Sequence, residues 1–324
     1  MNNPLVTIVI PYAYNIKFLQ ILLASLKETD IALCQIWVMN NTPQPDRSID
    51  GIKKTSLGDG VRIYDVPSPR DWHGGCIDYA LPDIETPFFM MMESDCQAVK
   101  ASWLDNFLIP IEKDNLVAMA GWFWPGGDRN YIGPGATIYD TQIVKSINEE
   151  VQRNKKITFC YGDGLKQRHT LEPRMLDAKW LWGPFTETRS YHDIVKREEK
   201  WWQEPCAWLY YRCSFEYECV RLPGVFSNQH YNGVNIANAT YYGSLNDHYF
   251  IHHWGGTVSH NWEKQKVTAP WELAALPYWI AREDNLWQEI VPESIRRQTL
   301  DMGLVKTGDE EMDFILNHEN VLKV

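Results

Sequence analysis

Two carboxylate side chains, Glu93 and Asp95, stand on either side of Ser94 directly after the apolar run Phe88–Met92. A charged group that emerges from a buried strand is costly unless it is solvated, paired or bound to a cation. Carboxylate oxygens are preferred ligands of divalent cations, and such a cation neutralises phosphate charge locally. The triplet therefore favours a metal-assisted site for a phosphorylated ligand, although an ordinary polar strand end would explain these three residues equally well.

Apolar stretches in the first third of the chain predict the elements that position this triplet. They predict strands at residues 6–10, 34–39, 61–66 and 88–92. Leucines at helical spacing predict an amphipathic helix from the N-cap residue Asn15 to about Glu28. Strand, helix and strand in this order form the unit of a parallel sheet. We therefore expect an α/β fold with a mostly parallel sheet flanked by helices.

The ends of three predicted strands carry the candidate ligand-binding residues. These ends are Pro11 and Tyr12, Asn40 and Asn41, and residues 93–95. Ligands of open α/β sheets bind beyond the carboxyl ends of the strands. We therefore expect the three ends to converge on one crevice. A fourth candidate is the tight turn at residues 72–75, which opens a short helix at 76–80 and offers backbone N–H groups to a phosphate or sugar.

The remainder of the chain is less regular. We expect helices at residues 103–111, 141–150 and 205–217, and strands at 116–124, 219–222 and 249–254. Turn-forming residues at 125–128 and 133–135, and an Asn-rich and Tyr-rich stretch at 225–248, predict loops. From residue 271 onward the sequence is mostly helical in pattern.

Composition narrows the classes of partner. A formal net charge of −11 argues against nucleic acid and anionic lipid. No apolar run approaches the roughly 18 residues of a membrane span, and the N-terminus shows no secretory signal, so we expect no integral membrane segment. The seven cysteines form no Cys-x-x-Cys pair, which favours free thiols in a reducing cytoplasm and argues against structural zinc.

Several segments, in order, resemble the large inverting family of GT-A glycosyltransferases called family 2. Residues 92–95 stand where that family carries its Asp-x-Asp motif, with Glu93 in place of the first Asp. The other similar segments are residues 7–15, 36–42, 103–104, 209–212 and 222–223, together with residues 252–257, which are similar to the His-x-Gly-Gly segment of rhamnosyltransferase-like members. The similarity is good over residues 4–110, patchy to residue 260, and absent from the last sixty residues.

The resemblance implies a Rossmann-like GT-A fold and a nucleoside-diphosphate sugar as donor. Pro11 and Tyr12 would flank the nucleobase, and Asn40 stands where the family usually has an acidic residue. Glu93 would face the ribose or the metal through water, with Ser94 beside it. Asp78, on the short helix after the tight turn, is a weaker candidate for a donor sugar hydroxyl.

The metal implied by the resemblance is Mn²⁺ or Mg²⁺, with Asp95 as its direct ligand. His253 would approach the metal or the diphosphate, unless it is a packed histidine bonded to backbone. Its neighbour His252 points to the opposite face of a regular strand, so only one of the two should matter. The metal would withdraw charge from the leaving diphosphate.

Inversion requires a base that takes the proton of the acceptor hydroxyl. We expect Glu204 in this role, with Asp193 as the second candidate, and a helix N-cap as the alternative role of Glu204. The acceptor would be a saccharide or glycoconjugate in polysaccharide synthesis. On this reading, residues 1–125 bind the nucleotide sugar and residues 126–262 bind the acceptor. Residues 263–324 form a helical extension that packs on the core or mediates self-association.

Three other readings remain. A nucleotidyltransferase also uses a parallel sheet and carboxylates, but residues 11–15 lack the Gly-rich loop and basic residue typical of that class. A retaining glycosyltransferase on the same fold would differ in the stereochemistry of its product. A non-catalytic carbohydrate-binding protein would bind donor or sugar without metal-dependent release of nucleotide.

Overall fold

The structure is a computed structural model of the 324-residue chain. It describes residues 3–12, 16–29, 31–41, 47–54, 56–66, 72–123, 132–153, 207–231 and 234–254. These residues fall into two compact units, one built on a seven-stranded sheet and one on a four-stranded sheet.

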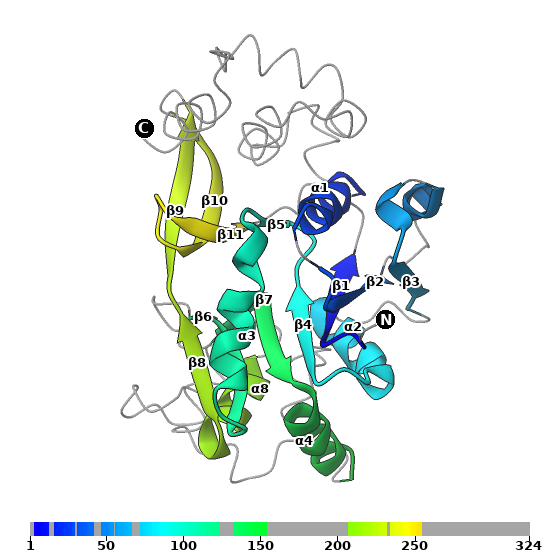
Figure 1. The fold of residues 1–324 in the computed structure, drawn as a ribbon, viewed down its shortest axis with the longest axis vertical. Coiled ribbons are helices and arrows are strands. Elements are labelled where there is room, and N and C mark those ends of the chain that lie inside the picture. The colour runs from blue at the N-terminus through cyan, green and yellow to red at the C-terminus, as the bar shows by residue number, and fades with distance from the viewer. Residues whose placement is uncertain are drawn as a thin grey trace, which may run out of the picture. The chain divides into compact units, whose positions relative to one another are not determined.

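The first unit contains a mixed, mostly parallel sheet (Figure 1). Its strands are β1 Val6–Tyr12, β2 Cys34–Asn40, β3 Val61–Asp65, β4 Phe88–Met92, β6 Val117–Phe123, β7 Ile132–Asp140 and β8 Glu218–Leu222. They lie in the order β3-β2-β1-β4-β7-β6-β8. Neighbouring strands are parallel except at β7, which is antiparallel to both β4 and β6. The predicted fold class is confirmed.

The strand that leads to the carboxylate triplet lies in the middle of this sheet. Strand β4 has three strands on each side, and its residues from Phe89 to Met92 are buried. A strand covered on both faces needs apolar side chains on both faces, which accounts for its unbroken Phe-Phe-Met-Met-Met sequence. Its neighbour β1 is buried at all seven positions. The predicted strand at residues 88–92 is confirmed, and it is the central strand of the sheet.

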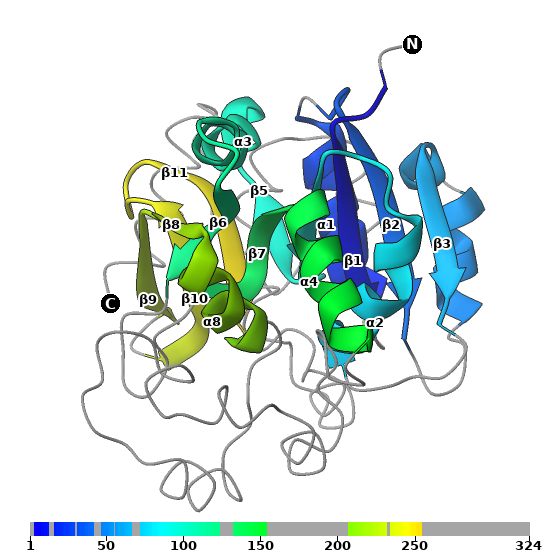
Figure 2. The same cartoon turned by 90° about the horizontal axis from the view of Figure 1, so that it is seen from below.

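Helices cover the sheet of the first unit. They are α2 Trp72–Ala80, α3 Asp105–Glu112, α4 Thr141–Arg153 and α8 Ala207–Glu216. Residues of α2, α4 and α8 share one apolar core with residues of β1, β2, β4, β6 and β7. Figure 2 shows α3 on the other side of the sheet from α8. Short 3₁₀ helices span Arg47–Lys54, Ser56–Gly58, Leu81–Asp83 and Ala101–Trp103.

The second unit contains helix α1 and a four-stranded sheet. The helix spans Ile16–Lys27, and the strands are β5 Cys96–Ala98, β9 Gly224–Tyr231, β10 Val234–Gly243 and β11 His248–Trp254. The sheet order is β5-β11-β10-β9, and β11 is antiparallel to both β5 and β10. The Ser25 hydroxyl of α1 joins helix to sheet, since it accepts a hydrogen bond of 3.1 Å from the Ala98 N–H.

Three expectations about these elements were wrong. Residues 133–135 belong to β7, and most of residues 225–248 belong to β9 and β10 rather than to loops. The helix expected from residue 76 begins at Trp72, so the predicted tight turn at 72–75 is its first turn. In β7 the partner of Met92 is Ala136, so Pro134 lies beyond the end of β4, where its missing N–H breaks no ladder bond to that strand.

Several expectations fall outside the described residues. They concern Glu204, Asp193, the predicted helical segment from residue 263 and the helix start at Pro205. The division at residues 125 and 262 stays a prediction. None of the described helices is long and apolar enough to cross a membrane.

Candidate active site

The carboxyl ends of β1, β2 and β3 form one polar edge in the first unit. The strand register places Tyr12 beside Asn40 and Asn40 beside Asp65. The backbone N–H of Asn41 donates to the carbonyl of Tyr12 at 2.9 Å, which ties the two strand ends together. The Asn40 side chain is 3% exposed, and its Nδ2 donates a 2.9 Å hydrogen bond to Asp65 Oδ1. The amide at position 40 is therefore held against a carboxylate from the next strand.

Glu93 follows β4 at the same edge of the sheet. Strand β4 is parallel to β1 with Val9 beside Met91, so Pro11 and Glu93 each come two residues further along. The Glu93 backbone N–H donates to the Gly135 carbonyl at 2.8 Å, and the residue is 8% exposed. The strand register thus places Pro11, Tyr12, Asn40 and Glu93 at one edge of the sheet, and the expected crevice stays a prediction. Their roles in nucleotide binding stay predictions.

Two further residues expected to contact the nucleotide-sugar donor are Asp78 and Ser94. Asp78 lies half-buried on α2. Ser94 is 1% exposed, and its hydroxyl has no hydrogen-bond partner among the described residues. A buried hydroxyl without a partner is uncommon, because burial removes it from water. Ser94 therefore fits a position that a ligand completes, while the role of Asp78 stays a prediction.

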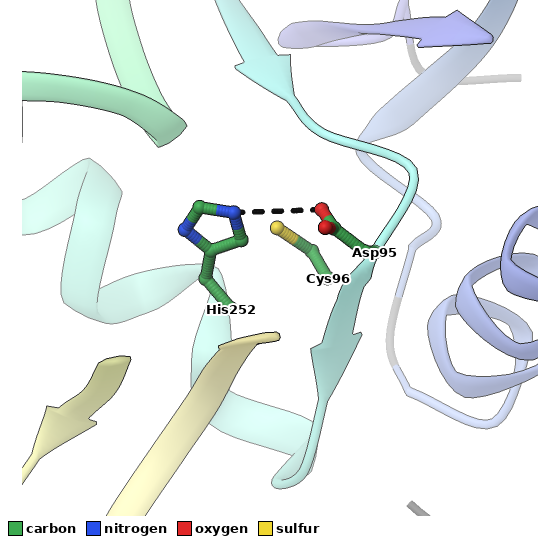
Figure 3. A group of neighbouring side chains, drawn as sticks. All are labelled: Asp95, Cys96 and His252. Atoms are coloured by element: carbon green, nitrogen blue, oxygen red, sulfur yellow. Dashed lines mark ion pairs between the residues drawn. The ribbon is translucent and has the colours of Figure 1, made fainter. Parts of the chain in front are cut away.

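The second unit brings together Asp95, Cys96 and His252 (Figure 3). One potential ligand atom from each lies within 4.8 Å of the others, and all three residues are buried. The His252 Nε2 atom is 3.4 Å from Asp95 Oδ1. No other group of three such side chains is present in the described part of the chain.

Strand pairing explains why these residues meet. His252 of β11 has two register partners. Cys96 of β5 lies opposite it on one side, and Thr240 of β10 lies opposite it on the other. Residues directly opposite each other in an antiparallel pair place their side chains on the same face. Asp95 immediately precedes β5, and its carbonyl accepts a 2.9 Å hydrogen bond from the His253 N–H. The ladder thus continues one residue beyond the strand, where Asp95 lies opposite His253. Asp95 lies in a turn, and its carboxylate Oδ1 is 3.4 Å from His252 Nε2.

The neighbouring histidine has different contacts. The Nε2 atom of His253 lies 3.1 Å from Oε1 of Gln97, and both residues are buried. Gln97 pairs with Ile251, so its side chain and that of His253 share the face opposite to His252. The expectation that the two histidines point to opposite faces is consistent with these contacts. Of the two, the structure groups His252 with Asp95, and the predicted metal role of His253 stays untested.

The donor atoms of this cluster are one carboxylate oxygen, one thiol sulfur and one imidazole nitrogen. Oxygen and nitrogen suit Mn²⁺ and its neighbours in the transition series, whereas Mg²⁺ prefers oxygen ligands only. The residues present therefore fit a divalent transition-metal ion. Sequence reasoning missed Cys96 and His252 because it lacked the register between β5 and β11. Alternation along residues 249–254 gave two faces but not which of them meets Asp95.

A mostly parallel sheet with polar residues at the carboxyl ends of its strands is the arrangement of nucleotide-binding α/β proteins. A family model described as glycosyl transferase family 2 matches residues 7–169, just over half of the chain. The chain belongs to glycosyl transferase family 2.

Parts of the chain are similar to several solved structures, of which three follow. TarS 1-349 from S. aureus, in complex with UDP-GlcNAc, is 15% identical with a TM-score of 0.36, over 44% of this chain and 47% of that chain. The mannosyltransferase PcManGT from Pyrobaculum calidifontis, in complex with GDP-Man and Mn²⁺, is 11% identical with a TM-score of 0.40. The match covers 66% of this chain and 69% of that chain.

The third is glucosyl-3-phosphoglycerate synthase from Mycobacterium tuberculosis, in complex with Mn²⁺, UDP and glucosyl-3-phosphoglycerate. It is 11% identical with a TM-score of 0.35, over 44% of this chain and 59% of that chain. The matched part thus spans about half the length of the TarS fragment. A comparison with curated protein sequences found no match.

Proposed function

We propose that this family 2 glycosyltransferase moves a sugar from a nucleoside-diphosphate donor to an acceptor hydroxyl, with inversion and with a divalent cation. The observation that carries the proposal is the buried pair of Asp95 and His252, with 3.4 Å between Oδ1 and Nε2. Burying a carboxylate is costly unless a partner compensates its charge. A cation site at the motif that resembles Asp-x-Asp gives the burial of Asp95 a functional reason.

Asp95 and His252 would hold the cation, with the imidazole ligating through its neutral nitrogen. A divalent cation bound there supplies positive charge to the diphosphate as it departs. The chain's own contribution is to fix the two ligand side chains. The hydrogen bond from the His253 N–H to the Asp95 carbonyl and the pairing of Cys96 with His252 hold them on adjacent strands. Such fixed ligands need little rearrangement when the donor binds.

The edge of the first unit would take the nucleoside. Pro11 and Tyr12 would flank the base, Asn40 would contact it or the ribose, and Glu93 and Ser94 would face the ribose and diphosphate. Support comes from the placement of four of these five residues at one sheet edge. The hydrogen bond from Asn40 to Asp65 also supports nucleoside binding at this edge. The Asp65 carboxylate orients the Asn40 amide, so its oxygen and nitrogen point in defined directions.

Three finer parts of the proposal rest on the sequence. Glu204, or else Asp193, would take the proton of the acceptor hydroxyl as the bond to the sugar forms. Hexosyl or deoxyhexosyl transfer to a saccharide or glycoconjugate, in polysaccharide synthesis, is supported by the similarity of residues 252–257 to rhamnosyltransferase-like members. A cytoplasmic setting is supported by the described cysteines, none of which forms a disulfide bond: Cys34, Cys76, Cys96, Cys213 and Cys219.

A nucleotide-release assay tests the proposal. Wild-type protein and Asp95→Asn are incubated with UDP, GDP, dTDP and CMP sugars and simple saccharide acceptors, with Mn²⁺ or with a chelator. We expect release from at least one donor that needs Mn²⁺ and falls by more than about 100-fold in the variant, since one preorganised charge contributes this much. The anomeric configuration of the product then tests inversion. Donor binding without any release would show a binding protein instead.

A further inference from the structure

We propose that Cys96 is a third protein ligand of the cation, so that the site selects a thiophilic divalent metal such as Zn²⁺ or Co²⁺ over Mg²⁺. This inference rests on the proposed function of the Asp95 and His252 pair. It adds a sulfur donor and a metal preference to that site.

The position of the sulfur supports the inference. Figure 3 shows the Cys96 side chain directed into the space between the His252 ring and the Asp95 carboxylate. The three ligand atoms lie within 4.8 Å of one another, and the residues are between 1% and 3% exposed. Because Cys96 and His252 are register partners, the same ladder that fixes the imidazole also fixes the sulfur.

The surroundings of Cys96 differ from those of the other described thiols. Burial raises the pKa of the Cys76 thiol, and burial likewise raises the pKa of Cys219 to about 12, so both favour the protonated form. Among the described residues, Cys96 alone of the cysteines belongs to a group of three ligating side chains. A protonated buried thiol packs as a small apolar group, whereas a thiol beside a carboxylate and an imidazole has the neighbours of a metal ligand.

The charges and the number of ligands are consistent with this role. On binding, the metal–sulfur bond forms and the thiol proton leaves to solvent, with no change of oxidation state. One carboxylate and one thiolate then balance a divalent cation in a buried site. Three protein ligands leave at least one coordination position open, which is typical of catalytic rather than structural sites. Thiolate sulfur favours Zn²⁺ and Co²⁺, whereas Mg²⁺ takes oxygen ligands.

Titration of the full-length protein with Co²⁺ tests the inference by absorbance. We expect visible d–d bands from bound cobalt together with a near-ultraviolet sulfur-to-cobalt charge-transfer band. In Cys96→Ser the charge-transfer band should disappear while visible bands remain. Zn²⁺ affinity, measured by displacement of cobalt, should fall at least about 10-fold in that variant, since even changes around a metal ligand cost this much. Weak competition by Mg²⁺ is expected in every variant.

The matched control is Cys34→Ser, which makes the same chemical change at a half-buried thiol at the start of β2. It should keep the charge-transfer band. Cys96→Ala, checked by circular dichroism, provides a second variant should the serine disturb folding. Visible bands without a charge-transfer band in the wild type would overturn the role of Cys96 and leave the metal-dependent transferase intact. Absence of any cobalt band would reject both the sulfur ligand and the metal site, and nucleotide release in chelator would then show a metal-independent transferase.

Discussion

The Nε2 atom of His252 lies 3.4 Å from the Oδ1 atom of Asp95, and both side chains are almost fully buried. The two residues are far apart in sequence, and the pairing of β5 with β11 brings them together. A buried carboxylate that loses its partner is costly, so removing His252 would leave Asp95 uncompensated. The same pair would ligate a cation, so its loss should be visible both in stability and in metal binding.

The two adjacent histidines should differ in their effect on metal binding. His252→Gln removes a nitrogen next to Asp95, whereas His253→Gln changes a ring that contacts Gln97 on the other face. We expect His252→Gln and Asp95→Asn each to lower Mn²⁺ affinity at least about 10-fold. His253→Gln should lower it much less. Isothermal titration with Mn²⁺ measures all three, and a larger loss in His253→Gln would assign the metal to the other histidine.

Placing an aspartate at position 40 should destabilise the protein. Asn40→Asp restores the acidic residue usual at this place in the resembled family. It also sets a second carboxylate against Asp65, because Asn40 Nδ2 and Asp65 Oδ1 are 2.9 Å apart in the wild type. Loss of the hydrogen bond and the new repulsion should lower the free energy of unfolding by about 1–3 kcal/mol at pH 7. Urea denaturation should show the loss shrinking as the pH falls, because protonation of one carboxyl relieves the repulsion.

The compensating variant is Asn40→Asp combined with Asp65→Asn. It exchanges amide and carboxylate across the same pair and should recover most of the lost stability. If Asn40→Asp alone is as stable as the wild type at pH 7, the pair does not hold these two strand ends together.

The buried His248 should make stability depend on pH. Burial lowers its pKa, against the opposing effect of the hydrogen bond from Nδ1 to the Leu245 carbonyl. Lys100 lowers the pKa further and Asp247 raises it. The folded state therefore binds its proton less readily than the unfolded state. Stability should be at its full value above the unfolded pKa of about 6.5 and fall as pH drops below it, by up to about 1.4 kcal/mol per pH unit.

His248→Phe isolates this contribution, since its ring can still pack against Tyr241. The free energies of unfolding of wild type and variant are compared by urea denaturation from pH 5.5 to 7.5. The difference between them should move in favour of the variant as the pH falls. A difference that is constant over this range would show that His248 titrates alike in the folded and unfolded states.

Gly121 should tolerate no side chain. A Cβ there would lie 2.5 Å from both Ile132 Cγ2 and Thr137 Oγ1, between β6 and β7. We expect Gly121→Ala to lower the free energy of unfolding by about 1–3 kcal/mol through overpacking. Gly51→Ala is the matched control, because a Cβ at that position would meet nothing within 4 Å. That variant should be neutral or slightly more stable in chemical denaturation, and equal effects at both sites would contradict the packing of β6 on β7.

The parts of the fold that sequence predicted share a local signal. Strands β1, β2 and β4 are continuous apolar runs because both of their faces are buried, and such runs are visible without knowledge of the partners. Helices α1 and α4 likewise lie where helices were expected. These elements include the strand ends that position Tyr12 and Asn40.

The missed strands carry residues typical of turns and loops, and their structure is decided by pairing with neighbouring strands. Pro134 and two glycines suggested a turn, yet β7 is held between β4 and β6, and its register with β6 shifts between Gly121 and Phe123. The Asn-rich stretch before residue 248 suggested a loop, although Asn232 and Gly233 between the two strands are a typical hairpin signal. For the same reason the choice between His252 and His253 needed the register of β11 with β5.

Binding of nucleotides tests the central claim most directly. Isothermal titration of wild type, Asp95→Asn and His252→Gln with UDP, GDP, dTDP and CMP is carried out with Mn²⁺, with Co²⁺ and with a chelator. We predict that at least one nucleotide binds the wild type at least about 10-fold more tightly with a metal, and that both variants lose this gain. Equal affinity with and without metal in the wild type, or a gain that survives in both variants, would contradict the metal site at Asp95 and His252.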